Sequence, residues 1–259
     1  MGSSDVQGKL WGAASSDWLE NERFAVPLYD AVFDAVGLRG GERMLDLGCG
    51  AGLALQMASD LGVIVTGLDA SEELLRVAKT RVPAADLRRG DLEALPFSDD
   101  SYDVVTSFNA IQFAADPTAA LREAKRVMAP GGQFAIVTWG EFERCDIRWV
   151  FAEIGRLLPP PPPGAEGPFA LSAPGRLEGL VESVGLAPTN SAMVAAPFTF
   201  PDLESAIRIQ MSAGPLQRCV QVAGEAATRQ ALSDAFAHAR LDDGSYRLEN
   251  EFRYLVATA

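Results

Sequence analysis

The sequence has no apolar run that approaches the roughly 18 residues needed to span a bilayer. Its N-terminal residues also lack the charged segment followed by an apolar stretch that marks a secretory signal peptide. Cysteine is scarce: Cys49, Cys145 and Cys219 are odd in number and too widely separated for a disulfide framework or a CxxC site. We therefore expect a cytoplasmic protein with reduced thiols.

Positive charge is also in short supply. The chain carries 22 Lys and Arg against 35 Asp and Glu, a net charge of -13. Charge of this sign repels the phosphate backbone of nucleic acids and the anionic surface of membranes. We therefore expect a small-molecule partner, with no nucleic acid and no membrane, while the sequence leaves open whether the protein is a monomer or a homodimer.

What the sequence does contain is enough apolar material, 48% of its residues, for a packed core. From residue 43 onward, short β-rich runs alternate with longer amphipathic stretches, a pattern that predicts βαβ units and a parallel sheet. The runs read as strands are MLDLG, VIVTGLD, DLRRGD, YDVVTSFN and QFAIVTW. The turn at residues 129–132 ends the helix before the last of these, because Pro cannot continue a helix and Gly accepts positive φ.

The flanks of this alternating region read as mostly helical, with two further strands expected in TNSAMVAAPFTF and in the closing RLENEFRYLVATA. Residues 10–36 carry five large aromatic residues and predict one or two helices over an apolar surface. We predict an N-terminal helical cap at 1–40 and a second unit at 41–259, with helical insertions at about 141–185 and 201–245. The proline run at 159–163 favours an extended, stiff spacer within the first insertion.

A glycine loop is the strongest sign of a ligand site. Gly48, Gly50 and Gly52 stand between a strand and a helix, where glycine lets the backbone turn tightly and approach a ligand. Alone, this spacing could be an ordinary glycine-rich turn. The dinucleotide fingerprint requires a further glycine where Leu53 stands, so NAD and FAD are disfavoured.

Three acids follow successive predicted strands. Asp46, Asp69 and Asp91 fall at carboxyl ends of strands, the edge at which open α/β sheets bind ligands. Any one of them could instead cap a helix. Together with the glycine loop they indicate a binding site, in which Asp69 could accept hydrogen bonds from both hydroxyls of a ribose.

Four segments now resemble the successive motifs of one family. LDLGCGAG, VTGLDAS, RGDLEALPFSDDSYDVV and APGG are similar to the motifs of class I SAM-dependent methyltransferases, most closely the ubiquinone/menaquinone-biosynthesis-like (methyltransferase type 11) subgroup. The resemblance covers about residues 43–139. It implies a Rossmann-like, seven-stranded, mostly parallel sheet with a reversed final hairpin, helices on both faces and helical lid insertions.

The resemblance also implies how S-adenosyl-L-methionine (SAM) is bound. The glycines would hold its methionine part near Asp46, Asp69 its ribose, and the residues around Asp91 its adenine, with Asn109 near the sulfonium. The implied cofactor-binding residues are Asp46, Gly48, Cys49, Gly50, Gly52, Asp69, Ala70, Asp91, Leu92 and Asn109.

The catalytic residues expected from the resemblance are Gln112 and Asn109. Gln112 stands where the subgroup often has a His, and Gln can orient an acceptor but cannot take its proton. Methyl transfer is an in-line displacement that alignment and exclusion of water can accelerate. His238 is the only histidine, and we interpret it as an ordinary helix residue, with a base reaching in from a lid as the alternative.

Aromatic residues could wall the acceptor site. We predict a substrate pocket formed by Trp11, Trp18, Phe113 and Trp139, although aromatic residues at such positions also build cores. The acids after the fifth strand, Glu141, Glu143 and Asp146, lack a matching Asp-Asn pair downstream. We interpret them as a solvated loop and expect no metal site.

The sequence thus predicts a methyltransferase acting on O, N or S of a small-molecule metabolite, in secondary metabolism, without a dedicated histidine base. Two alternatives stay open: a SAM-binding enzyme that does not methylate, such as a cyclase or decarboxylase, and a catalytically silent SAM-binding subunit. The acceptor and its attacked atom are not readable from the sequence.

Overall fold

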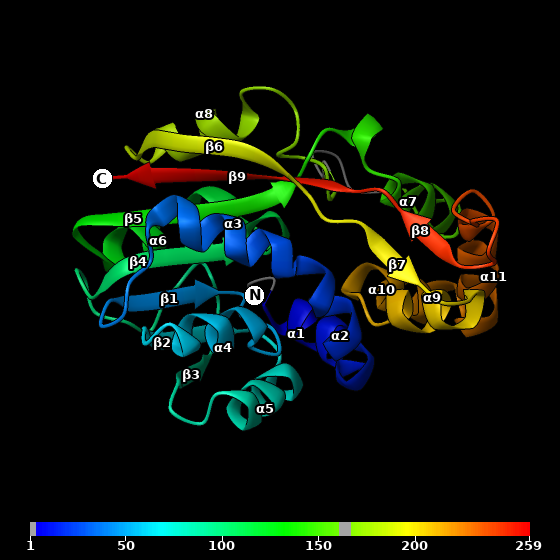
Figure 1. Cartoon of the computed structure of the whole chain (residues 1–259), viewed down its shortest axis with the longest axis horizontal. Coiled ribbons are helices and arrows are strands. Elements are labelled where there is room, and N and C mark those ends of the chain that lie inside the picture. Colours follow the sequence, from blue (N-terminus) through cyan, green and yellow to red (C-terminus); the bar gives the residue numbers. More distant parts are fainter. Residues whose placement is uncertain (1–3, 161–166) are drawn as a thin grey trace.

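A single seven-stranded sheet organises the molecule (Figure 1). The computed structural model describes residues 4–160 and 167–259. The strand order is β3-β2-β1-β4-β5-β9-β6, and only β9 runs antiparallel to its neighbours within this sheet. The strands are β1 (Arg43–Leu47), β2 (Ile64–Asp69), β3 (Asp86–Arg89), β4 (Tyr102–Phe108), β5 (Met128–Trp139), β6 (Ala187–Ala195) and β9 (Glu251–Thr258). The predicted fold class is confirmed, including the reversed final strand.

Helices cover both faces of the sheet because successive strand residues point to opposite sides. In β1, Met44 packs with the helices of one face and Leu45 with those of the other, and both are fully buried. These flanking helices are α3 (Val26–Val36) and α4 (Leu53–Asp60) on the first face, and α6 (Pro117–Val127) and α8 (Arg176–Ser183) on the second. α5 (Glu72–Arg81) follows β2 and packs beside β3. The sheet is therefore the middle layer of three.

Local signals set several helix ends as the sequence suggests. The Ser71 side chain accepts the N–H of Leu74 at the start of α5, and the Asp116 carboxylate caps α6 directly before Pro117. α6 ends at Val127, and the following turn, with Gly131 at a φ of 77°, lies within β5, whose pairing with β4 is irregular there.

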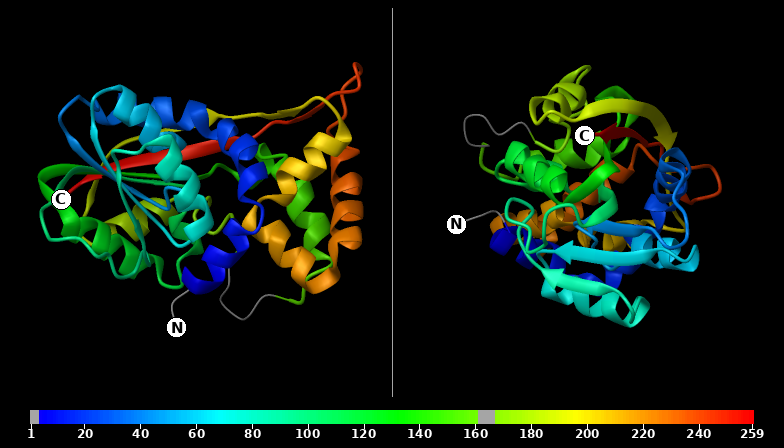
Figure 2. Two further views of the ribbon diagram at one scale, coloured as in Figure 1. Left: turned by 90° about the horizontal axis from the view of Figure 1, so that it is seen from below. Right: turned by 90° about the vertical axis from the view of Figure 1, so that its left-hand side faces the viewer.

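Beyond the carboxyl ends of the parallel strands lies a group of elements that we name the helical extension (Figures 1 and 2). It consists of α7 (Ile147–Gly155), α9 (Leu203–Met211), α10 (Gly214–Ala223), α11 (Glu225–Phe236) and the paired strands β7 (Phe198–Phe200) and β8 (Tyr246–Leu248). α8 falls within the first insertion predicted at 141–185, yet it packs on β6 as part of the sheet layers. Part of the proline run, residues 161–163, lies outside the described residues.

The N-terminal segment forms three helices rather than one or two. α1 (Ser4–Gly12) and α2 (Ser15–Glu22) contact the helical extension, whereas α3 packs on the sheet. Short 3-10 helices complete the chain: η1 (Arg23–Ala25), η2 (Ile111–Phe113) and η3 (Phe142–Arg144). The cap predicted at 1–40 therefore contains helices of two kinds, and the division into units stays a prediction.

The position of α1 depends on one glycine. A Cβ built on Gly8 would lie 2.3 Å from the carbonyl oxygen of Ala70, just after β2. Only glycine allows α1 to approach that backbone so closely. α1 and α2 thus lie over the edge of the sheet at which β2 ends, between that edge and the helical extension (Figure 2).

Candidate active site

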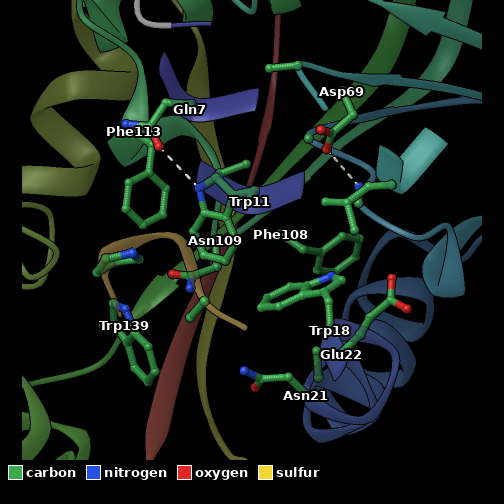
Figure 3. A pocket seen from close by; sticks show the side chains of 18 of the residues that line it. Gln7, Trp11, Trp18, Asn21, Glu22, Asp69, Phe108, Asn109, Phe113 and Trp139 are labelled. Carbon is green, nitrogen blue, oxygen red and sulfur yellow. Dashed lines mark hydrogen bonds between the residues drawn. The ribbon is translucent and has the colours of Figure 1, made fainter. Parts of the chain in front are cut away.

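One cavity runs from the carboxyl ends of the strands to the helical extension, and encloses about 1440 Å³, part of it open to solvent. Most of the residues predicted from the sequence line it. They are Gly48, Gly50, Asp69, Ala70, Asp91, Leu92 and Asn109 from the expected cofactor site, and Trp11, Trp18, Phe113 and Trp139 from the expected substrate pocket. Figure 3 shows Asp69 and Glu22 on one side of it and Phe113 and Trp139 on the other, with Trp11 and Trp18 between them.

The glycine loop brings backbone, not side chains, to the cavity. Gly48, Gly50 and Gly52 all have positive φ, of 80°, 53° and 79°. A Cβ on Gly48 would lie 2.4 Å from the Cβ of Ala110, so the loop can pass the end of β4 only without a side chain. Gly52 is different: it faces Ala78 of α5 and begins α4, so it serves helix packing and does not line the cavity.

Asp69 ties the loop to the end of β2. Its Oδ2 accepts the N–H of Gly50 at 2.8 Å, and its Oδ1 accepts the N–H of Ser71 at 2.7 Å. Burial raises the pKa of Asp69, although these N–H groups act in the opposite direction. The carboxylate is thereby held in a fixed orientation at the cavity wall. Asp91, after β3, also lines the cavity and accepts the N–H of Glu93 at 3.0 Å.

Two residues of the predicted cofactor set lie behind the cavity wall rather than on it. Asp46 is 2% exposed, and its Oδ1 accepts the hydroxyl of Thr106 at 2.8 Å. The pKa of Asp46 is raised to about 7: burial is the largest cause, the Thr106 hydrogen bond opposes it, and the charges of Asp69 and Glu22 add to it. Cys49 is also buried, with its side chain directed at Gly67 in the sheet.

Glu22 is a site residue that the sequence did not reveal. It comes from α2, is 4% exposed and lines the cavity. Its carboxylate accepts a hydrogen bond from Arg81 at 2.6 Å and another from the N–H of Leu53, at the start of α4, at 3.1 Å. Burial raises its pKa, against the effect of Arg81. The only sequence signal for this role was an acidic residue within the aromatic segment 10–36, which was predicted to be helical.

Away from the glycine loop the cavity is aromatic, and its Trp18 reaches back to Gly50. Trp11 contacts Trp18 and Phe113 edge-to-face, with centroids 4.9 and 5.4 Å apart, and its Nε1 donates to Gln7 at 3.2 Å (Figure 3). Trp139 stacks on Phe252 at 4.2 Å. Phe108 also lines the cavity, as do residues that the sequence did not single out: Phe24, Phe151, Phe198, Gln210 and Phe252, with Tyr29 nearer to Glu22. We name this part the aromatic chamber.

Gln112 does not line the cavity. Its Nε2 donates to Oδ1 of Asn109, which does line it and which has a φ of 53°. His238 lies after the end of α11, not within the helix, and is exposed, with its ring 5.4 Å from that of Trp149. The structure thus places Gln112 behind Asn109 and His238 outside the cavity.

Of the three acids after β5, Glu141 and Glu143 are exposed, and Asp146 has partners within the structure. Asp146 pairs with Arg148 at 3.1 Å and accepts the N–H of Glu249 at 2.9 Å. Within residues 4–160 and 167–259, no group of three or more His, Cys, Asp or Glu side chains is arranged to hold a metal ion. In the same part of the chain no helix has the length and apolar character to cross a membrane.

The central region of the chain matches a known family. Residues 45–136 match the model of the methyltransferase domain. This stretch begins in β1 and ends in β5, so it contains the glycine loop, Asp69, Asp91 and Asn109. The predicted resemblance is confirmed over this stretch, which matches the methyltransferase domain.

Two curated proteins illustrate the match. The chain is 38% identical over 129 residues to a demethylmenaquinone methyltransferase of Renibacterium salmoninarum, covering 49% of this chain and 54% of that one. It is 35% identical over 168 residues to a malonyl-[acyl-carrier protein] O-methyltransferase of Erwinia pyrifoliae, covering 64% and 59%. The chain therefore spans little more than half the length of these curated relatives.

The same fold occurs among solved structures, for example in the [4+2]-cyclase SpnF. That structure superimposes with a TM-score of 0.59 over 89% of this chain and 79% of the cyclase, at 22% identity. At this identity the likeness concerns the fold.

We predict that Asp46→Asn stabilises the ligand-free protein more at pH 8 than at pH 5. The folded-state pKa of about 7 exceeds the ordinary 3.8, so the folded protein keeps a proton that the unfolded chain releases, and the free energy of unfolding falls as the pH rises between these values. Asn at position 46 has no proton to release, so this loss of stability at higher pH disappears. Its side-chain oxygen can still accept the hydrogen bond from the Thr106 hydroxyl. Thermal unfolding at the two pH values measures the difference in Tm. Equal gains at both, or the same pattern in the exposed control Asp60→Asn, would contradict a buried charge at Asp46.

Proposed function

We propose that this protein is a SAM-dependent methyltransferase that acts on a small-molecule acceptor. The observation that carries the proposal is the continuity of the cavity, which joins the glycine loop and Asp69 to the aromatic chamber. A donor held at the first end and an acceptor held at the second would meet inside one enclosed space. The methyltransferase domain over residues 45–136 supports the same assignment.

The residues at the loop end fit SAM. Gly48 and Gly50 let its methionine part approach the backbone, and the Asp69 carboxylate suits the two ribose hydroxyls. Asp91 and Leu92 would face the adenine. Glu22 on the wall and Asp46 behind it are acids in a buried region, and the positively charged sulfonium and ammonium groups would favour their ionised forms. The bound cofactor would supply an activated methyl group.

The chain's own contribution is alignment and exclusion of water. Asn109, held by Gln112, lies where the glycine end of the cavity meets the aromatic chamber. Burial and the charges of Glu22 and Asp46 raise the pKa of Tyr29 well above its ordinary value, so its phenol keeps its proton and does not act as a base. The acceptor must then be nucleophilic already or ionise easily, through O, N or S.

The setting of this activity is part of the proposal. The net charge of -13 favours a small-molecule metabolite over nucleic acid or a membrane surface. The two curated relatives carry names for a quinone-type and a carrier-bound acceptor, so the domain serves chemically different acceptors in these relatives. We propose a cytoplasmic enzyme of secondary metabolism.

One observation favours a second function. Among the described residues that line the cavity there is no histidine, lysine or cysteine to take a proton from an acceptor. A SAM-binding enzyme that rearranges its substrate without methylating it needs no such base, and a [4+2]-cyclase shares this fold. A silent SAM-binding subunit is the remaining alternative.

Incubation with methyl-labelled SAM and a metabolite extract distinguishes these functions. We expect a labelled small molecule from the wild-type protein and none from Asp69→Ala, because the variant loses the group that orients the loop and meets the ribose. Asp60→Ala, at the exposed end of α4, is the matched control and should retain activity. A rearranged, unlabelled product would favour the cyclase, and no product despite SAM binding would favour the silent subunit. Absence of SAM binding in calorimetry would refute the cofactor assignment.

Gln112→Ala should reduce turnover more than His238→Ala. The first change frees the Asn109 side chain, whereas His238 lies outside the cavity. We expect the resulting misalignment of the Asn109 side chain to lower kcat roughly 10- to 100-fold. The dissociation constant for SAM should change less than kcat, because most of the expected cofactor contacts come from the glycine loop, Asp69 and Asp91. The opposite ranking of the two variants would move the chemistry to the helical extension.

Gly8→Ala should weaken binding of S-adenosylhomocysteine several-fold. The new Cβ would lie 2.3 Å from the Ala70 carbonyl oxygen and would displace α1 from the site. Gly155→Ala is the matched control, because this helical glycine of α7 has no atom within 4 Å of the added Cβ. Calorimetric titration of both variants tests the role of α1; equal affinities would show that α1 does not cover the cofactor.

A further inference from the structure

A buried amide in the helical extension has no partner. Gln210 of α9 is 3% exposed and lines the cavity at the aromatic chamber. No described group accepts a hydrogen bond from its Nε2. An unpaired buried donor is unfavourable, so buried amides in native proteins nearly always find a partner.

The neighbouring amides show that partners are available to residues of this region. On α2, Asn21 donates through Nδ2 to the carbonyl oxygen of Ile209 at 3.1 Å and to the hydroxyl of Ser212 at 3.3 Å. On α10, Gln217 donates to the carbonyl oxygen of Met211 at 2.7 Å. Gln210 lies close in sequence to these partners, yet its own Nε2 has no acceptor. A ligand in the cavity could supply one.

The surroundings of Gln210 define the chemical class of the ligand that could pair with it. The charged residues that line the described cavity are Glu22, Asp69 and Asp91, all associated with the glycine loop end, and no arginine or lysine lines it. A phosphate or carboxylate in the aromatic chamber would therefore lack a counter-charge. The chamber walls are aromatic and apolar, which suits a flat, uncharged ring system.

We propose that Gln210 determines acceptor specificity by donating a hydrogen bond from Nε2 to a carbonyl oxygen of an uncharged aromatic acceptor. This inference rests on the proposed function, since it concerns the acceptor end of the same cavity. The amide costs stability while the chamber is empty, and it becomes paired when the carbonyl group enters. The protein thereby distinguishes two ring systems of equal shape that differ in one oxygen.

Xanthone and xanthene test this proposal, because they share a tricyclic frame and differ in the carbonyl group. Binding of each to the protein saturated with S-adenosylhomocysteine is measured by quenching of tryptophan fluorescence. We expect the wild-type protein to prefer xanthone by roughly 3- to 10-fold, the range for one neutral hydrogen bond. In Gln210→Met, a change that keeps the length of the side chain, the preference should fall to about one while xanthene binds as before.

Gln217→Met is the matched control. It removes an amide that is already paired outside the cavity, so the preference for xanthone should persist. Gln210→Met should also raise the Tm of the ligand-free protein, because it removes an unpaired buried donor, an effect that loss of a structural hydrogen bond would not produce. Gln210→Ala serves as the second variant if the Met variant fails to fold.

An unchanged preference in both Gln210 variants, or failure of the wild-type protein to bind either ring system, would overturn the assignment. The titration with S-adenosylhomocysteine alone separates this result from failure of the proposed function. If the wild-type protein binds S-adenosylhomocysteine while Gln210 has no influence on selectivity, only the role of Gln210 is refuted. If it does not bind S-adenosylhomocysteine, the cofactor assignment itself is refuted.

Discussion

The hydrogen bond from the Gly50 N–H to the Asp69 carboxylate joins the two segments on which the site depends. One segment follows β1 and the other ends β2, and the parallel pairing of these strands brings both to the same edge of the sheet. Because two backbone N–H groups hold this carboxylate, it keeps its orientation toward the cavity even when the cavity is empty. The binding edge is thus oriented before any ligand arrives, and the remaining walls are arranged around it.

The cavity changes character along its length. Near the glycine loop, burial and the neighbouring carboxylates raise the pKa of Asp46 and Glu22, and this region favours a ligand with positive charge. In the aromatic chamber, polar contact is reduced to a few neutral groups such as Gln210 and Asn109. The acids would therefore favour a charged donor at one end and the apolar walls a neutral acceptor at the other, with the reacting atoms between them.

The sequence was sufficient to predict the sheet and the loop end of the site because both depend on local patterns. Gly48 and Gly50 follow β1 within three residues and Asp69 ends β2, so the strand pattern alone places them at one edge. The direction of the Gln112 side chain could not be predicted from the strand pattern. η2 and the positive φ of Asn109 turn this segment so that Asn109 faces the cavity and Gln112 supports it from behind. Side-chain direction after a strand is set by such turns, which spacing does not report.

Glu22 and Gln210 could not be found from the sequence because they reach the site through packing between distant segments. α2 and α9 are fastened to each other by Arg208, which pairs with Asp17 at 2.6 Å and Glu20 at 2.8 Å, and by the amide of Asn21. The same two helices carry Glu22 to the glycine loop and Gln210 to the aromatic chamber. A movement of this helix pair would alter both ends of the cavity together. Access of the donor and selection of the acceptor therefore share one structural element, even though their recognition chemistry is separate.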